Sequence, residues 1–205
     1  TYVSGVLPAV HQVMFNGLLV RHPSGVPTVE PWRPKREMVK AQTVYDAAHA
    51  AGLTTAEVDW VAIHEPETIT WSFAERPNPG GAIEREMIAK GLVTADDIAT
   101  FNRGTPAAWR DQVWTDAAIH ILETHKPNLL LYHLLALDST HHTYGLGGLA
   151  SATAMAFVDA QVGRLMAAIE KSGLASKTTV IVLADHGFRN AKRAINPNVA
   201  LREAG

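Results

Sequence analysis

The chain has 205 residues, of which 47% are hydrophobic and 19% are charged, with a formal net charge of −2. This length suffices for one globular core, and the balanced charge argues against electrostatic binding to a nucleic-acid duplex or to anionic lipid. The absence of cysteine excludes disulfides, thiolate metal ligands and cysteine nucleophiles, and no apolar run reaches the length of a membrane segment.

The first predicted elements in chain order are a helix over 34–51, which Gly52 ends, and a strand over 57–63. Residues 64–105 then break the alternation with Pro, Gly and polar residues, followed by one or two short helices. We interpret this segment as an insertion above the sheet that shapes substrate specificity. Trp71 and Phe73 are candidates for stacking on a substrate ring, whereas Trp60 lies in the predicted strand and is expected in the core.

The second half of the chain alternates more regularly. A helix is predicted over 106–125, a continuous apolar strand over 128–137, a helix with a strong apolar stripe over 149–172, and a second apolar strand over 178–185. A helix between two parallel strands is the βαβ pattern. The sequence therefore predicts an α/β fold, with a mostly parallel sheet flanked by helices, in a single domain over residues 1–205. It gives no indication of the compartment.

Polar residues follow both apolar strands of this second half. Asp138 and His142 come after the first strand, and Asp185 and His186 after the second. Functional groups cluster beyond the carboxyl ends of parallel strands, and Asp and His are common zinc ligands, so the two pairs predict one dinuclear metal site. The alternatives are that Asp138 only caps a turn and that His142 is an ordinary loop histidine.

The stretches "LDSTHHTYG" and "TTVIVLADHGF" resemble the type I phosphodiesterase/nucleotide pyrophosphatase family of the alkaline phosphatase superfamily. That family carries Asp-x-x-Gly-His-x-x-Gly and Ser-Asp-His-Gly-Met at these places. The resemblance puts its metal ligands on Asp138, His142, Asp185 and His186. The sequence departs from the family pattern beside the ligands, at His141, Ala184 and Phe188.

The stretch "SGVLPAVHQVMFN" at 4–16 resembles the segment that follows the nucleophile in the same family. The register implies that Asn16 contacts the phosphoryl oxygens of the substrate, and we interpret His11 as structural. It also implies that the Thr or Ser nucleophile and one Asp ligand lie upstream of Thr1, and that the last His ligand lies beyond this chain. An alkaline-phosphatase-like core that is incomplete at both ends is therefore expected.

For the complete protein, the resemblance implies hydrolysis of phosphodiester or pyrophosphate bonds through a phospho-threonine or phospho-serine, with two zinc ions or other divalent metals. The substrate would be a small-molecule phosphodiester, a nucleotide or a phosphonate. The alternatives are a phosphonate hydrolase of the phosphonoacetate type and a noncatalytic, degenerate α/β module. The chain by itself is expected to bind metal weakly, to show little or no activity, and to self-associate through exposed apolar surface.

Overall fold

A small parallel sheet forms the centre of the computed structural model, which describes residues 1–14, 16–31, 33–61, 63–101 and 104–204. Its strands are β3 (Thr55–Val58), β4 (Trp71–Phe73) and β5 (Leu129–Tyr132), in the order β4-β3-β5 with both pairs parallel. A separate antiparallel hairpin is made by β1 (Leu18–Val20) and β2 (Thr28–Glu30). The predicted α/β class with a parallel sheet is confirmed.

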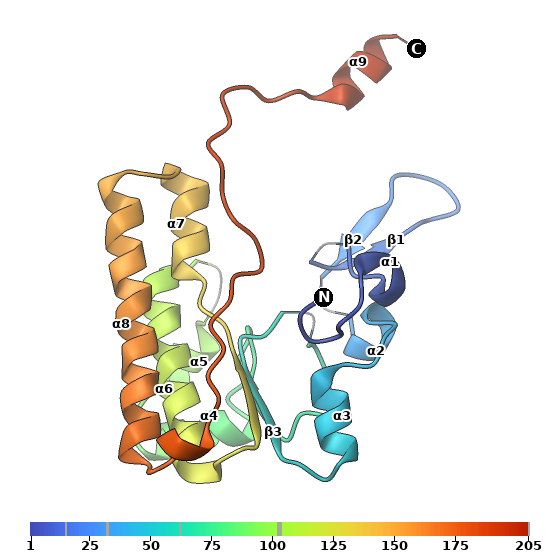
Figure 1. The fold of residues 1–205 in the computed structure, drawn as a ribbon. Helices are drawn as coiled ribbons and strands as arrows, with labels where there is room; N and C mark the ends of the chain where they lie inside the picture. Colours follow the sequence, from blue (N-terminus) through green and yellow to red (C-terminus); the bar gives the residue numbers. More distant parts are fainter. Residues whose placement is uncertain (15, 32, 62, 102–103, 205) are drawn as a thin grey trace.

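Helices cover both faces of the sheet, with α6 and α8 side by side on one face and α3 on the other (Figure 1). The two long helices confirm the predictions for 106–125 and 149–172. Within the described residues, no helix is both long enough and apolar enough to cross a membrane. The helices are α1 (Pro8–His11), α2 (Lys35–Met38), α3 (Val44–Ala50), α4 (Ala82–Ala89), α5 (Ala95–Ala99), α6 (Ala107–His125), α7 (Ala136–Tyr144), α8 (Leu149–Lys171) and α9 (Pro197–Glu203), with a 3-10 turn at Ala175–Lys177.

Side chains alternate between two apolar clusters, as expected for strands covered on both faces. Val58 and Phe73 are fully buried against Trp114 of α6, in the larger cluster. Leu131 points to the opposite face and packs with Tyr45 of α3, where Trp60 also packs. Trp60 thus packs against the core as expected, but it is only partly buried and follows β3 instead of lying in the strand predicted over 57–63. Phe73 is buried and cannot stack on a substrate, so that expectation is wrong.

The 34–51 and 64–105 segments differ from their predictions. The first contains two helices, because Thr43 starts a new helix through a capping box, in which its hydroxyl accepts from the Asp46 N–H at 3.2 Å and its own N–H donates to the Asp46 carboxylate at 2.9 Å. The second segment supplies β4 to the sheet and Ile83 and Met87 of α4 to the main core. The two short helices expected in this segment are confirmed as α4 and α5, and the segment also contributes to the sheet and the core.

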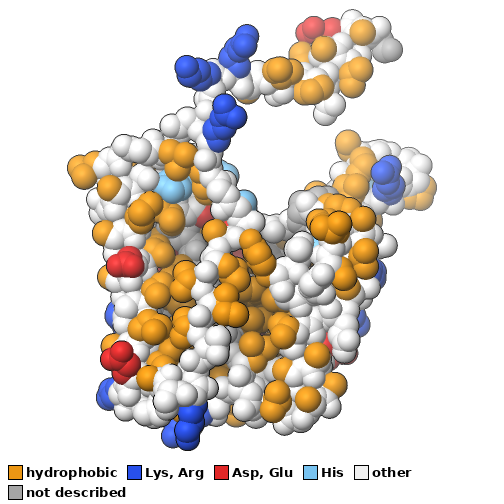
Figure 2. All heavy atoms as spheres, in the orientation of Figure 1, with side chains coloured by type: hydrophobic (Ala, Val, Ile, Leu, Met, Phe, Trp, Pro, Cys, Tyr) orange, Lys and Arg blue, Asp and Glu red, His pale blue; other side chains and the backbone are white. Residues whose placement is uncertain are grey.

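The strand predicted over 178–185 is not formed. These residues are extended and exposed, with 75% of Ile181 and 74% of Val182 accessible, and hydrophobic side chains are visible along this face in Figure 2. The apolar pattern was compatible with a strand, but a strand also needs a neighbouring strand, which local sequence does not specify. The Tyr2 hydroxyl donates to the Ala184 carbonyl at 2.8 Å, and just beyond this segment the Leu146 N–H donates to Asn190 Oδ1 at 2.9 Å.

Candidate metal centre

The four residues predicted as metal ligands lie together. Asp138 Oδ1 is 3.5 Å from His142 Nε2 and 3.6 Å from His186 Nε2, and Asp185 Oδ2 is 3.4 Å from His186 Nε2. We call Asp138, His142, Asp185 and His186 the carboxyl-edge cluster, because the chain reaches Asp138 just after β5 ends. Asp138 approaches both histidines to a similar distance, so the side chains form one group and not two separate pairs.

The elements that carry the cluster differ from the prediction. Asp138 does not end a strand but lies in the first turn of α7, and Asp185 lies in the extended segment outside the sheet. Helix α7 begins early because the buried Asp111 of α6 accepts hydrogen bonds from the N–H groups of Leu135 and Ala136, both at 2.9 Å. Burial raises the pKa of Asp111, and these two hydrogen bonds partly offset the effect.

Neighbouring contacts orient the imidazole rings of the cluster. His186 Nδ1 lies 3.2 Å from the Gly187 carbonyl, to which Nδ1–H can donate, and Nε2 faces Asp138 at 3.6 Å. The Phe188 ring meets His142 and His186 edge-on, with centroids 5.0 and 5.3 Å apart. His141 also meets Phe188 edge-on, with centroids 4.9 Å apart, and contacts Ser151 Oγ through Nε2 at 2.7 Å.

The pairwise separations in the cluster resemble those between two ligands of one metal ion, but no three of its donor atoms all lie within 4.8 Å of one another in the described structure. Separations of 3.4–3.6 Å are too long for good hydrogen bonds. Two ligands that each bind zinc at about 2.0–2.2 Å in a tetrahedral arrangement lie roughly 3.3–3.6 Å from each other. The mixed oxygen and nitrogen donors also suit zinc or a similar divalent ion. Solvent can reach the site, since 32% of the Asp138 side chain and 69% of the His142 side chain are exposed.

A second Asp/His pair that the sequence interpretation missed lies between the neighbouring strands β3 and β5. Asp59 follows β3 in a left-handed conformation (φ 54°), and its Oδ2 lies 2.7 Å from Nδ1 of His133, which follows β5. Burial raises the pKa of Asp59 to about 6, although the bond to His133 acts in the opposite direction. Burial would lower the pKa of His133, but Asp59, Asp111 and Asp185 outweigh it and raise that pKa.

Two N-terminal residues were singled out by the match to the family pattern, and neither contacts the carboxyl-edge cluster in the described part of the structure. Asn16 is exposed in the turn before β1, and among the described residues no hydrogen bond joins its side chain to the cluster. His11 is buried, accepts the Val13 N–H at Nδ1 over 3.1 Å and contacts Thr1 Oγ1 through Nε2 at 3.2 Å. These contacts agree with the structural role expected for His11.

Comparisons with known proteins agree with these motifs. A family model described as type I phosphodiesterase/nucleotide pyrophosphatase matches residues 1–205. Alkaline phosphatase PhoD from Zymomonas mobilis subsp. mobilis is 34% identical over 99 residues, which cover 45% of this chain and 16% of that protein. The chain thus spans only a small part of the length of this curated relative. Because the family model covers the whole chain, the chain belongs to the type I phosphodiesterase/nucleotide pyrophosphatase family.

Proposed function

We propose that the protein hydrolyses phosphodiester or pyrophosphate bonds at a divalent metal centre held by the carboxyl-edge cluster. Family membership supports the reaction class. The observation that carries the assignment of the site is the approach of Asp138 Oδ1 to the Nε2 atoms of His142 and His186, which belong to segments far apart in the sequence. A cation would be attracted to the Asp138 carboxylate, and binding both imidazoles as well would need them to move closer, because the three donor atoms do not all lie within 4.8 Å of one another in the described structure.

Two zinc ions are the metals proposed for the complete protein, and when bound they would supply Lewis-acid stabilisation of phosphoryl and leaving-group oxygens. Asp138, His142, Asp185 and His186 would hold them together with ligands from outside this chain. The proposal includes a Thr or Ser nucleophile upstream of Thr1 and a covalent phospho-enzyme. Asn16 would donate its amide N–H to a nonbridging phosphoryl oxygen, where charge develops in the transition state.

Cationic side chains beside the cluster favour a small anionic substrate such as a nucleotide, another phosphodiester or a phosphonate. Arg189, Lys192 and Arg193 follow His186 closely, and Figure 2 shows Lys and Arg side chains gathered on the segment that leads to α9. All three side chains are exposed. Their positive charge would raise the local concentration of phosphate esters.

Hydrolysis of bis(4-nitrophenyl) phosphate by the full-length protein tests the proposal. Asp138→Asn and Asp185→Asn should each lower kcat/KM by about 100-fold or more, because a metal ligand is lost. Asp159→Asn and His49→Ala change exposed residues of the same types away from the cluster and should keep full activity. Activity that survives in both ligand variants would remove the cluster from the reaction, and preferential turnover of phosphonoacetate would identify a phosphonate hydrolase instead.

The chain by itself is proposed to bind metal weakly at this cluster and to have little activity, since further ligands and the nucleophile are expected elsewhere. Titration calorimetry that shows tight zinc binding abolished by Asp138→Asn would overturn this. Exposed apolar residues such as Ile181 and Val182 also lead us to propose that the chain self-associates. Light scattering that gives a monomer at all concentrations would contradict that part.

A further inference from the structure

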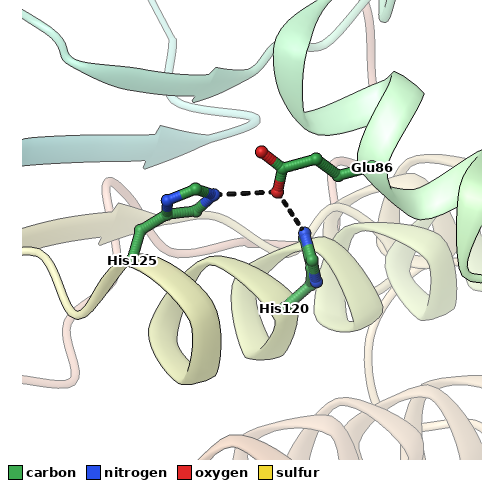
Figure 3. A group of neighbouring side chains, drawn as sticks. All are labelled: Glu86, His120 and His125. Carbon is green, nitrogen blue, oxygen red and sulfur yellow. Dashed lines mark hydrogen bonds and ion pairs between the residues drawn. The ribbon is translucent and has the colours of Figure 1, made fainter.

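Glu86, His120 and His125, which we call the amino-edge trio, form a second histidine–carboxylate group far from the carboxyl-edge cluster. Figure 3 shows Glu86 of α4 between the two imidazoles of α6, with Oε2 2.7 Å from His120 Nε2 and 2.8 Å from His125 Nε2. The three donor atoms all lie within 4.8 Å of one another. The trio sits where α6 ends and β5 is about to begin, at the amino ends of the strands.

Packing fixes the three side chains before any ligand binds. His120 is buried, with only 3% of its surface accessible, and Trp71 of β4 stacks on His125 with ring centroids 3.7 Å apart and an interplanar angle of 22°. Lys126 ends α6 in a left-handed conformation (φ 47°), which stops the helix directly after His125. Preorganised ligands of this kind lose little conformational freedom when they bind an ion.

The trio presents the donor set of a zinc site. One carboxylate oxygen and two imidazole nitrogens make a His2Glu set, and a water molecule can take the fourth position because 34% of the Glu86 side chain and 13% of the His125 side chain are exposed. Burial would raise the pKa of Glu86, but the two histidines outweigh it and lower that pKa, so the carboxylate is ionised.

A lysine beside His120 would compete with a metal ion for this imidazole. Lys90 Nζ lies 3.1 Å from His120 Nδ1, so the ammonium donates to that nitrogen and the ring proton stays on Nε2, facing Glu86. An ion at Nε2 requires the other tautomer, whose Nδ1–H can donate to Thr124 Oγ1 at 3.3 Å but cannot accept from Lys90. The two states therefore exclude each other.

We propose that Glu86, His120 and His125 bind one divalent transition-metal ion of the zinc class, and that the ammonium of Lys90 competes with this ion for His120. The ion would tie α4 to α6 at the edge of the sheet opposite the proposed catalytic centre. The bound ion replaces the two hydrogen bonds to Glu86, and the Nε2 proton of each histidine is released to solvent or moved to Nδ1. The site does not depend on the proposed phosphodiesterase activity.

Zinc titration by calorimetry, together with the visible absorption of bound Co²⁺, tests this site in the Asp138→Asn/Asp185→Asn protein, where the carboxyl-edge cluster is disabled. One ion should bind, and its absorption should report nitrogen and oxygen ligands in a low-coordinate site. Glu86→Gln and His125→Gln should each weaken binding by at least about 10–100-fold. No zinc binding in this background, or binding that Glu86→Gln leaves unchanged, would overturn the proposal.

Lys90→Met provides a second test of zinc affinity, in which all three proposed ligands are kept. It keeps an unbranched side chain of nearly the same length but deletes the competing ammonium, so zinc should bind about 10-fold more tightly. Lys171→Met, which changes an exposed lysine on α8, should leave the affinity unchanged. Equal affinity in the Lys90→Met and Lys171→Met proteins would refute the competition. Circular dichroism on each variant confirms that the fold is intact.

Discussion

The two histidine–carboxylate groups at opposite edges of the sheet are held in different ways. At the carboxyl edge, exposed side chains come from a short helix and from an extended segment with few anchors. At the amino edge, His120 is buried in a long helix and its partners come from packed elements. An arrangement on packed helices is fixed by the core, whereas one on an extended segment depends on a few polar contacts. The difference separates a group of side chains with few fixing contacts from a group whose side chains are held by packing.

Removal of the Asp111 carboxylate would affect the carboxyl edge most. Asp111→Ala leaves the N–H groups of Leu135 and Ala136 without their acceptor and should lower the free energy of unfolding by about 3–4 kcal/mol. Urea unfolding measures this loss. Helix α7 should also fray, and any zinc affinity at Asp138 should fall, while affinity at the amino-edge trio stays constant. A parallel loss at both edges would show that they are not independent.

The buried Glu57 of β3 makes stability depend on pH. Burial raises the pKa of Glu57 from 4.5 to about 7, even though Ser72 and the Trp60 N–H donate to the carboxylate. An acid whose pKa is higher in the folded state is most stabilising when protonated, so stability is full below pH 4.5 and falls as pH rises to about 7, by up to about 3 kcal/mol.

Glu57→Gln should remove this pH-dependent loss, because a neutral amide has no charge to bury. Urea unfolding at pH 4.5 and pH 7.5 measures the difference, and the exposed Glu170→Gln is the matched control, which should behave like the original protein. A Glu57→Gln protein that loses as much stability between these pH values as the original would disprove the assignment. Loss of the pH dependence in Glu57→Gln would show that the effect comes from Glu57 in β3 and from neither histidine–carboxylate group.

The stack between Trp71 and His125 can be tested at the amino edge. Trp71→Ala should lower the free energy of unfolding by about 2 kcal/mol, because a half-buried indole and its aromatic contact are lost. Trp71→Phe keeps a ring in place and should retain at least half of the stability that Trp71→Ala loses. Thermal unfolding of both variants provides the comparison. If Trp71→Ala and Trp71→Phe were equally unstable, the aromatic stack on His125 would not contribute to stability.

The smallest effect on stability is expected at His142. Its side chain is 69% exposed, so His142→Ala should change the free energy of unfolding by no more than about 0.5 kcal/mol. His120→Ala removes a buried imidazole and should cost about 2 kcal/mol or more. Chemical denaturation of the two variants side by side measures the contrast. Similar costs would mean that the carboxyl edge is as firmly held as the amino edge.

The long helices and the grouping of Asp and His residues were predictable from sequence, whereas strand pairing was not. Helices α6 and α8 carry apolar residues at helical spacing along many turns, so their ends were predicted within a residue or two. The apolar run at 178–185 has the composition of a strand but remains unpaired, because pairing depends on distant residues. Asp138 and His186 were nonetheless predicted to meet, because both were placed beyond the carboxyl ends of parallel strands and both match the family motifs. They do lie close together, although the second of those strands is not formed.

The groups that the sequence did not disclose are those joined across large sequence separations. Asp59 and His133 lie 74 residues apart, and the only local signal was that each directly follows a parallel strand. His120 and His125 are not at the i, i+4 spacing that places two ligands on one helix face, and Glu86 lies 34 residues before His120. Only the packing of α4 against α6 brings the trio together, and that contact has no signature in the order of residues.

Helix α6 contributes residues at both edges, with Asp111 near its start and His125 at its end. At 1.5 Å per residue, these two positions are roughly 20 Å apart along the helix axis, which is about twice the distance over which physiological salt screens exposed charges. Screening of this kind acts between the exposed groups, so an ion beside the part-exposed Glu86 is expected to change the electrostatic potential at the exposed His142 very little. Because the helix is packed along its length, it also transmits little bending. Ion occupancy at the two edges should be statistically independent, so one edge can be saturated or empty without biasing the chemistry of the other.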